Sequence, residues 1–134
     1  MVASLRARGR RGRILMLSRR GLLPRPRTML PVSAFGVFDQ PPSATAIGLL
    51  RRVRIAVREA AAAGRPWEDV IDALRAQARV VWGALPSAER HRLLRHLRPF
   101  WDAHRFQSAP PVDLVVAAGV ARGEVALILS LIHI

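Results

Sequence analysis

Three adjacent residues, Ser18, Arg19 and Arg20, have the types and the position to do chemistry together. They follow four consecutive apolar residues at positions 14–17, and a short apolar run bounded by polar turn residues is typical of a buried strand. In a dinucleotide-binding αβ unit, the ribose end of the cofactor lies at the tip of such a strand. A guanidinium group binds phosphate through two parallel, charge-assisted hydrogen bonds. The triplet therefore predicts a cofactor-binding site.

The residue type at this strand end also distinguishes the two nicotinamide cofactors. An acid there accepts hydrogen bonds from the ribose hydroxyls of NAD, whereas Ser18, Arg19 and Arg20 suit the additional 2′-phosphate of NADP. A basic turn whose arginines are merely solvated is the alternative interpretation. The Gly-rich phosphate loop that should precede the strand is missing from the sequence, so we expect a fragment of a longer protein.

The elements that would position this site lie at the start of the chain. Residues 1–8 are expected to form a short helix that ends at Gly9. With the strand that follows, residues 1–22 are predicted to be a partial NAD(P)-binding Rossmann αβ piece. Five prolines make residues 23–42 a linker, within which residues 32–38 are expected to pack as an extended segment.

From residue 43 onward, apolar residues recur at helical spacing. Ser43 is expected to cap the first helix, and Pro99 to kink or split the third. The sequence predicts an all-α insertion of about four helices over residues 43–121 and the start of a strand over 122–128. The expected fold class is mainly α as a fragment of an α/β parent. The four helices are expected over residues 43–63, 66–85, 87–104 and 112–121.

The last six residues, 129–134, match the translation of a common sequencing-library adapter. We therefore predict that this stretch is an artefact rather than native sequence. His133 is accordingly given no functional role.

Charge supplies the alternative function. The net charge is +13, all 22 basic residues are arginine, and residues 1–27 hold nine of them without an acid. Such a block can neutralise phosphates of nucleic acid, lipid or cofactor, and Arg51, Arg52, Arg54 and Arg58 could follow a phosphate backbone. The alternative is therefore a small basic helical binding module for nucleic acid or a protein partner. Nucleic acid is the less favoured partner, because we expect the aromatic residues to pack in the core rather than to be exposed for base stacking.

Several other kinds of site are not favoured. The sequence has no cysteine and no Gly-x-Ser-x-Gly motif, which excludes thiol chemistry and disfavours a hydrolytic triad. His91, His96 and His104 are five and eight residues apart, whereas zinc pairs on a helix are three or four apart. We expect no metal and no catalytic residue in this chain. No stretch reaches the roughly 18–20 apolar residues of a membrane span, so a soluble, cytoplasmic protein is expected.

Parts of the sequence resemble a known family. Residues 5–14 and 18–25 look like the middle of uncharacterised FAD/NAD(P)-binding proteins, a group related to flavin-dependent N-hydroxylating monooxygenases and urate hydroxylase-like enzymes. Residues 94–105 and 109–110 are similar to the helical segment of the same proteins. The resemblance extends over residues 1 to about 127.

The resemblance implies a fragment of a FAD- and NAD(P)H-dependent oxidoreductase or monooxygenase-like protein. Ser18, Arg19 and Arg20 would belong to its NAD(P)H site, with NADPH favoured. The full-length protein would transfer a hydride from NADPH to flavin, whereas this chain would not be catalytic alone and would bind neither cofactor well. The sequence departs from the family pattern at Arg27, where a histidine is expected.

Overall fold

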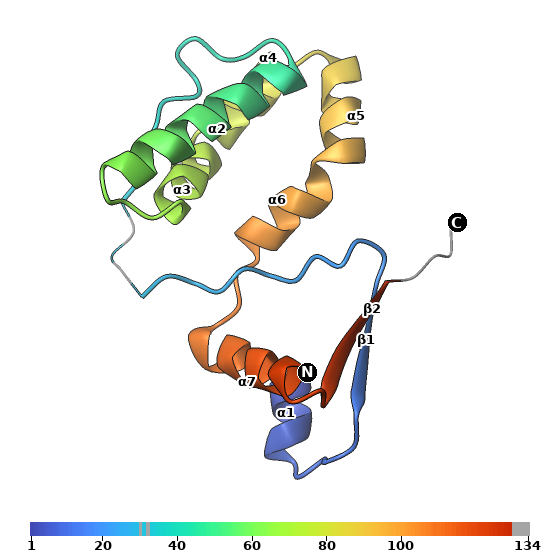
Figure 1. Cartoon of the computed structure of the whole chain (residues 1–134). Coiled ribbons are helices and arrows are strands. Elements are labelled where there is room, and N and C mark those ends of the chain that lie inside the picture. Colours follow the sequence, from blue (N-terminus) through green and yellow to red (C-terminus); the bar gives the residue numbers. More distant parts are fainter. Residues whose placement is uncertain (30, 32, 130–134) are drawn as a thin grey trace. The chain divides into compact units, whose positions relative to one another are not determined.

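The computed structural model describes residues 1–29, 31 and 33–129. The chain divides into two compact units. Residues 1–27 and the described residues from Phe106 onward form the α/β unit, and Thr28–Arg105 forms the helical unit. Over the described ranges the chain has seven helices and one two-stranded parallel sheet (Figure 1). The expectation of a mainly α chain is therefore confirmed.

The α/β unit repeats a helix followed by a strand. The helix α1 (Val2–Ala7) precedes the strand β1 (Ile14–Ser18), and α7 (Pro110–Ala121) precedes β2 (Val125–Leu129). The strands pair in parallel, from Ile14 opposite Val125 to Ser18 opposite Leu129. Parallel strands cannot be joined by a tight turn, and the connection here ends in α7, which packs on both α1 and β2.

A glycine lets α7 lie close to β2. A Cβ atom at Gly119 would be 2.6 Å from Cγ2 of Val125, which is far inside ordinary van der Waals contact. Val125 is 2% exposed and is the most buried residue of its strand. The absence of a side chain at Gly119 therefore sets the distance between this helix and the sheet.

Residues 14–17 form a strand, as predicted, but the prediction that this strand is buried is wrong. Along β1, Ile14 and Met16 are half-buried, whereas Leu15 is 56% exposed and Leu17 is 75% exposed. Successive side chains of a strand point to opposite faces of the sheet. One face of the two-stranded sheet therefore packs within the unit, and on the other face Leu15 and Leu17 are exposed.

The helical unit contains five helices within its described residues. The helix expected over residues 87–104 is split at Leu97, as Pro99 predicts, and Pro99 is the second residue of the helix that follows. A further break at Gln77 divides the helix expected over residues 66–85. Thr45, rather than Ser43, caps the first helix, because its hydroxyl accepts a hydrogen bond from the Gly48 N–H at 3.1 Å. The helices are α2 (Ala46–Ala62), α3 (Glu68–Ala76), α4 (Ala78–Ala84), α5 (Ser87–His96) and α6 (Arg98–Arg105).

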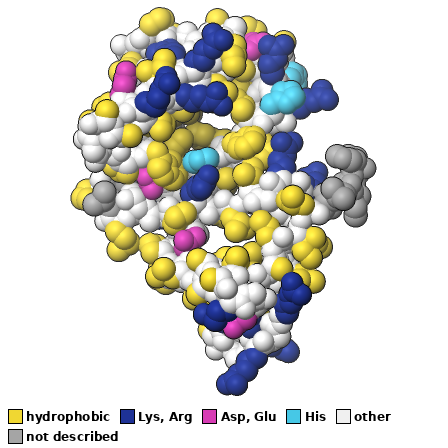
Figure 2. Space-filling model, viewed as in Figure 1, with side chains coloured by type: hydrophobic (Ala, Val, Ile, Leu, Met, Phe, Trp, Pro, Cys, Tyr) yellow, Lys and Arg dark blue, Asp and Glu magenta, His cyan; other side chains and the backbone are white. Residues whose placement is uncertain are grey.

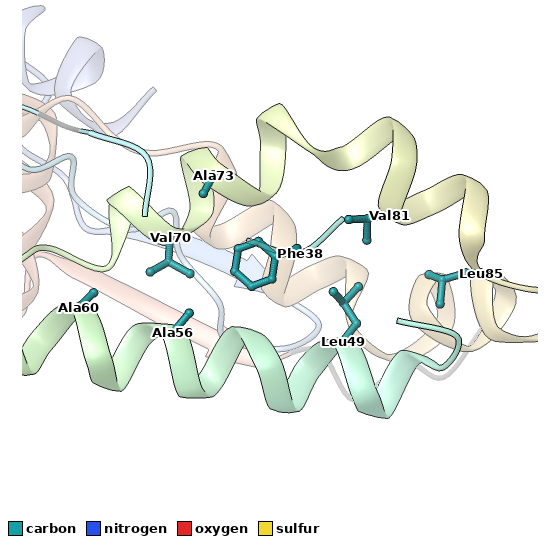
Figure 3. Packing of buried hydrophobic residues seen from close by; sticks show 8 residues of the cluster. All are labelled: Phe38, Leu49, Ala56, Ala60, Val70, Ala73, Val81 and Leu85. Atoms are coloured by element: carbon teal, nitrogen blue, oxygen red, sulfur yellow. The ribbon is translucent and has the colours of Figure 1, made fainter. Parts of the chain in front are cut away.

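The core of this unit forms around a residue outside the helices. Phe38 is 1% exposed and lies between α2 on one side and α3 and α4 on the other (Figure 3). An extended packed segment before α2 is thus present, although Val32 of the predicted range lies outside the described residues. The core cluster consists of Phe38, Leu49, Ala56, Ala60, Val70, Ala73, Val81 and Leu85.

The Gln77 side chain, at the break between α3 and α4, binds the extended segment. Its Oε1 accepts hydrogen bonds from the backbone N–H groups of Phe38 and Asp39, the latter at 3.1 Å. Its Nε2 donates to the carbonyl oxygen of Gly36 at 2.9 Å. One amide thus satisfies three backbone groups of a segment that lies outside the helices and the sheet.

Two predicted boundaries fall differently in the structure. The range 43–121, expected as one helical insertion, is divided between the two units, since α7 packs with α1 and β2. Of the predicted artefact, Leu129 is the last residue of β2, and residues 130–134 lie outside the described part of the chain.

Candidate cofactor-binding site

Ser18, Arg19 and Arg20 lie at the carboxyl end of β1. Ser18 is the last residue of the strand and stands opposite Leu129, the last residue of β2. The two parallel strands therefore end at the same edge of the sheet. In open parallel α/β sheets, ligands bind outside this edge.

The Ser18 side chain shapes the turn that follows. Its Oγ accepts hydrogen bonds from the backbone N–H groups of Gly21 at 3.1 Å and Arg20 at 3.4 Å. Gly21 has a φ of 66°, a left-handed conformation that glycine adopts without strain. The hydroxyl still has its own proton to donate. Ser18 thus positions the two arginines and keeps one hydrogen bond for a ligand.

Arg19 and Arg20 carry unneutralised charge. Both side chains are exposed, and neither makes a hydrogen bond or ion pair with any residue that the structure describes. Arg6 of the same unit differs, because it contacts the Glu124 carboxylate at 3.4 Å and donates to the Arg10 carbonyl oxygen at 2.7 Å. The two arginines at the strand end are therefore available to an anion.

Helix N-termini of this unit add little to phosphate binding. The first turn of α7 contains Pro110 and Pro111, which have no N–H group to donate, and the negative charge of Asp113. Asp113 is itself bonded to the Ser108 hydroxyl at 3.3 Å. An anion at the sheet edge would accordingly be bound by side chains rather than by a helix N-terminus.

The cofactors implied by the family resemblance fit these residues unequally. The exposed guanidinium groups of Arg19 and Arg20 match the charge of the NADPH 2′-phosphate. By contrast, the sequence contains no Gly-x-Gly-x-x-Gly loop for the pyrophosphate of either NADPH or FAD. The described residues thus offer positive charge for a ribose phosphate but no Gly-rich loop for a pyrophosphate.

The opposite, amino-terminal end of the sheet is closed by an ion-pair network. The Arg122 guanidinium donates to both carboxylate oxygens of Glu124, at 2.9 and 3.1 Å. These hydrogen bonds lower the pKa of Glu124 below its ordinary value and raise the pKa of Arg122. The Glu124 carbonyl oxygen also accepts from the Ile14 N–H at 2.8 Å. Arg6 and Arg122 are thus both paired with Glu124 inside the α/β unit.

Arg52, grouped in the sequence with Arg51, Arg54 and Arg58, has a structural role. Its guanidinium donates to the backbone carbonyls of the extended segment, at 2.7 Å to Val37. The other three are exposed. Helical geometry places residue 52 about 100° around the helix from residue 51, but it does not predict the carbonyl partners of Arg52.

The three candidate histidines are not brought together. His91 and His96 are exposed on α5, whereas His104 is half-buried in α6. The His104 ring meets the Trp67 ring edge-on, with centroids 5.0 Å apart, and its Nδ1 lies 2.7 Å from the Phe100 carbonyl oxygen. His104 thus has a packing role.

A groove in the helical unit offers little for chemistry. The Arg75 side chain on its wall is neutralised by Asp72 at 2.8 Å, and Arg105 also has a partner. The groove is lined by Asp72, Arg75, Ala76, Ala78, Trp101 and Arg105. Across the described ranges, no three acidic or histidine side chains cluster as a metal site would require.

Over the same ranges, no helix combines the length and the apolar character that spanning a membrane requires. Comparison of the sequence and the structure with known proteins finds no matching family model, no matching curated protein and no matching solved structure.

Proposed function

We propose that the α/β unit is part of the NADPH-binding half of a FAD- and NAD(P)H-dependent oxidoreductase or monooxygenase-like protein. Arg19 and Arg20 bind the 2′-phosphate of NADPH, and Ser18 holds the turn that presents them. The observation that carries the proposal is the pair of exposed, unneutralised arginines at the carboxyl end of two parallel strands.

The exposed face of the sheet supports a larger parent domain. Parallel sheets occur almost only in proteins that cover both of their faces. Here Leu15 and Leu17 of β1 and Ile128 of β2 are 56%, 75% and 41% exposed. These side chains are suited to a second helical layer and further strands, which are features of a complete dinucleotide-binding domain.

Within this proposal the chain's own residues bind and orient, and NADPH, when bound, supplies the hydride. The two guanidinium groups distinguish NADPH from NADH, because NADH lacks the phosphate that they contact. The Ser18 hydroxyl can donate one hydrogen bond to that phosphate while it continues to accept from Gly21. No residue of this chain is assigned a role in the chemical step.

The test compares NADPH with NADH on the intact chain. Amide chemical shifts are followed by NMR during titration of each cofactor, for the unchanged protein and for the double variant Arg19→Ala and Arg20→Ala. We expect NADPH to shift the amides of residues 18–21 at millimolar concentrations. Loss of the two arginines should weaken NADPH binding about ten- to a hundredfold, as expected for charged hydrogen bonds, and leave NADH binding unchanged.

A matched control removes the same charge from the other end of β1. The double variant Arg10→Ala and Arg11→Ala loses two exposed arginines whose side chains have no partner among the described residues. It should change NADPH affinity by less than about twofold at moderate salt, because distant surface charges are screened. The proposal would be contradicted if both double variants lost NADPH affinity equally. It would also be contradicted if loss of Arg19 and Arg20 weakened NADPH and NADH binding equally.

A further inference from the structure

The outer face of α2 combines positive charge with exposed aliphatic side chains. Arg51, Arg54 and Arg58 lie on it together with Ile47 and Ile55, and all five are exposed. At 3.6 residues per turn these positions fall within an arc of about 100°. We call these five residues the α2 stripe. Figure 2 shows basic side chains over α2, and others beside histidines over α5, on the same face of this unit.

The charge of the α2 stripe is not neutralised by any residue that the structure describes. Arg51, Arg54 and Arg58 make no hydrogen bond or ion pair with any described residue, although they stand one turn apart and repel one another. Other arginines of the same unit do find partners. Four form ion pairs, namely Arg65, Arg75, Arg92 and Arg98, and two donate to backbone carbonyls, namely Arg52 and Arg90.

The two isoleucines indicate what kind of partner fits. Ile47 is 51% exposed and Ile55 is 44% exposed, and they stand about two turns apart on the stripe. The phosphates of a nucleic acid backbone would pair with the arginines, but the backbone would offer the two isoleucines no apolar surface to pack against. An amphipathic helix with an acidic edge matches both, because it presents carboxylates beside an apolar row.

We propose that the α2 stripe is a docking surface for an acidic amphipathic helix of a partner protein. The partner's carboxylates pair with Arg51, Arg54 and Arg58, and its apolar row covers Ile47 and Ile55. Positive charge on the neighbouring α5 raises the rate of encounter with such a helix. All of these residues belong to the helical unit, so the proposal is independent of the cofactor site.

The experiment measures binding of labelled probes to the intact chain by fluorescence anisotropy. The main probe is a synthetic helical peptide of glutamate and leucine, with leucines at positions i, i+4 and i+7. A peptide of the same composition in scrambled order and a single-stranded DNA of about 20 nucleotides serve as comparison probes. We expect the amphipathic peptide to bind most tightly of the three at physiological salt.

Two variants assign the contributions of charge and apolar contact. The triple variant Arg51→Ala, Arg54→Ala and Arg58→Ala should weaken peptide binding at least about tenfold, equivalent to about 1.4 kcal/mol. The double variant Ile47→Ala and Ile55→Ala should weaken it by a similar factor. A control, Arg79→Ala, removes an exposed arginine of α4 that likewise has no partner among the described residues. It should leave affinity within about threefold, because Arg79 lies on another helix, outside the α2 stripe.

The outcomes separate the partner classes. Dependence on both the arginines and the isoleucines, with a preference for the ordered peptide, supports a protein helix. Tighter binding of DNA that is insensitive to the isoleucine variant would assign the surface to nucleic acid and overturn the proposal. Equal binding of the scrambled peptide, equal loss in the control, or no binding would overturn it as well.

Discussion

The carboxylate of Asp69 lies 2.6 Å from the guanidinium of Arg65, one helical turn earlier in the chain. Asp69 is 1% exposed and also accepts a hydrogen bond from the Ser33 N–H at 2.9 Å. Arg65 in turn donates to the Ser33 carbonyl and lies over the ring of Phe35, 4.8 Å from its centroid. The pair thus joins the extended segment to the start of α3.

Replacing Asp69 with asparagine should destabilise the helical unit. The change leaves Arg65 without its carboxylate and weakens the hydrogen bond to Ser33. Breaking a buried pair costs about 3–5 kcal/mol, and the partial exposure of Arg65 reduces our expectation to about 2 kcal/mol. The three tryptophans all lie in this unit, so urea unfolding followed by tryptophan fluorescence measures its stability.

The control for this prediction is the ion pair of Asp72 with Arg75. Its N–O distance is 2.8 Å, but its side chains are 43% and 50% exposed. Replacing Asp72 with asparagine should therefore cost less than about 1 kcal/mol. Equal costs at the two positions would show that burial is not what gives the Asp69 pair its strength.

A second prediction concerns Gln77. Replacing it with alanine leaves the Phe38 and Asp39 N–H groups and the Gly36 carbonyl without their present partners. Because this site is only partly buried, we expect a loss of about 1–3 kcal/mol in the free energy of unfolding. Urea unfolding measures it, and Gln77→Glu should recover part of the loss because a carboxylate still accepts from both N–H groups. A glutamate variant less stable than the alanine variant would contradict this account.

Gln77 also shows where prediction from sequence fails. Helical spacing predicted one continuous helix over residues 66–85, and only the parts on either side of Gln77 are helical. Pro99 signalled the later break at Leu97 through its missing N–H group. The break at Gln77 follows from hydrogen bonds to residues about forty positions earlier, and local propensity contains no information on such distant contacts.

The candidate site was predictable to a similar extent. The order of helix, turn, strand and Ser-Arg-Arg is local, and it predicted where the triplet lies relative to β1. The exposure of Leu15 and Leu17 was not predictable, because burial of a strand depends on which other elements cover it. The inward position of Arg52 likewise depends on the path of residues 37–41.

A third prediction concerns acid stability of the α/β unit. The hydrogen bonds from Arg122 lower the pKa of Glu124 below its ordinary value of 4.5. A lowered folded-state pKa gives stability that is present above the unfolded pKa and is lost as pH falls through the folded pKa. The unit should therefore lose stability as pH falls below about 4.5, and Glu124→Gln should remove this part of the loss.

Amide hydrogen exchange of β1 and β2 is the suitable measurement, since the α/β unit contains no tryptophan. The variant Arg122→Met should reduce the same loss of stability at low pH. The double variant should reduce this loss no further than either single variant does. Additive effects of the two changes would show that the pair is not the source of the pH dependence.

The last prediction tests the close approach of α7 to β2. Gly119→Ala places a Cβ atom 2.6 Å from Val125 Cγ2, so the helix must move away from the sheet. Overpacking of this kind costs about 1–3 kcal/mol, partly offset by up to about 1 kcal/mol from the better helix propensity of alanine. Amide exchange of β2 should accelerate accordingly. Adding Val125→Ala, which removes the colliding methyl group, should restore the position of α7, measured by NMR contacts between residues 119 and 125.

Gly83 in α4 is the matched control, because a Cβ atom there would meet nothing within 4 Å. Gly83→Ala should stabilise the helical unit by up to about 1 kcal/mol through helix propensity alone. Opposite signs for the two glycine variants are therefore expected, since only Gly119 is required by packing. A stabilising Gly119→Ala would mean that α7 can withdraw from β2 without loss, and that the helix does not fix the position of the strand.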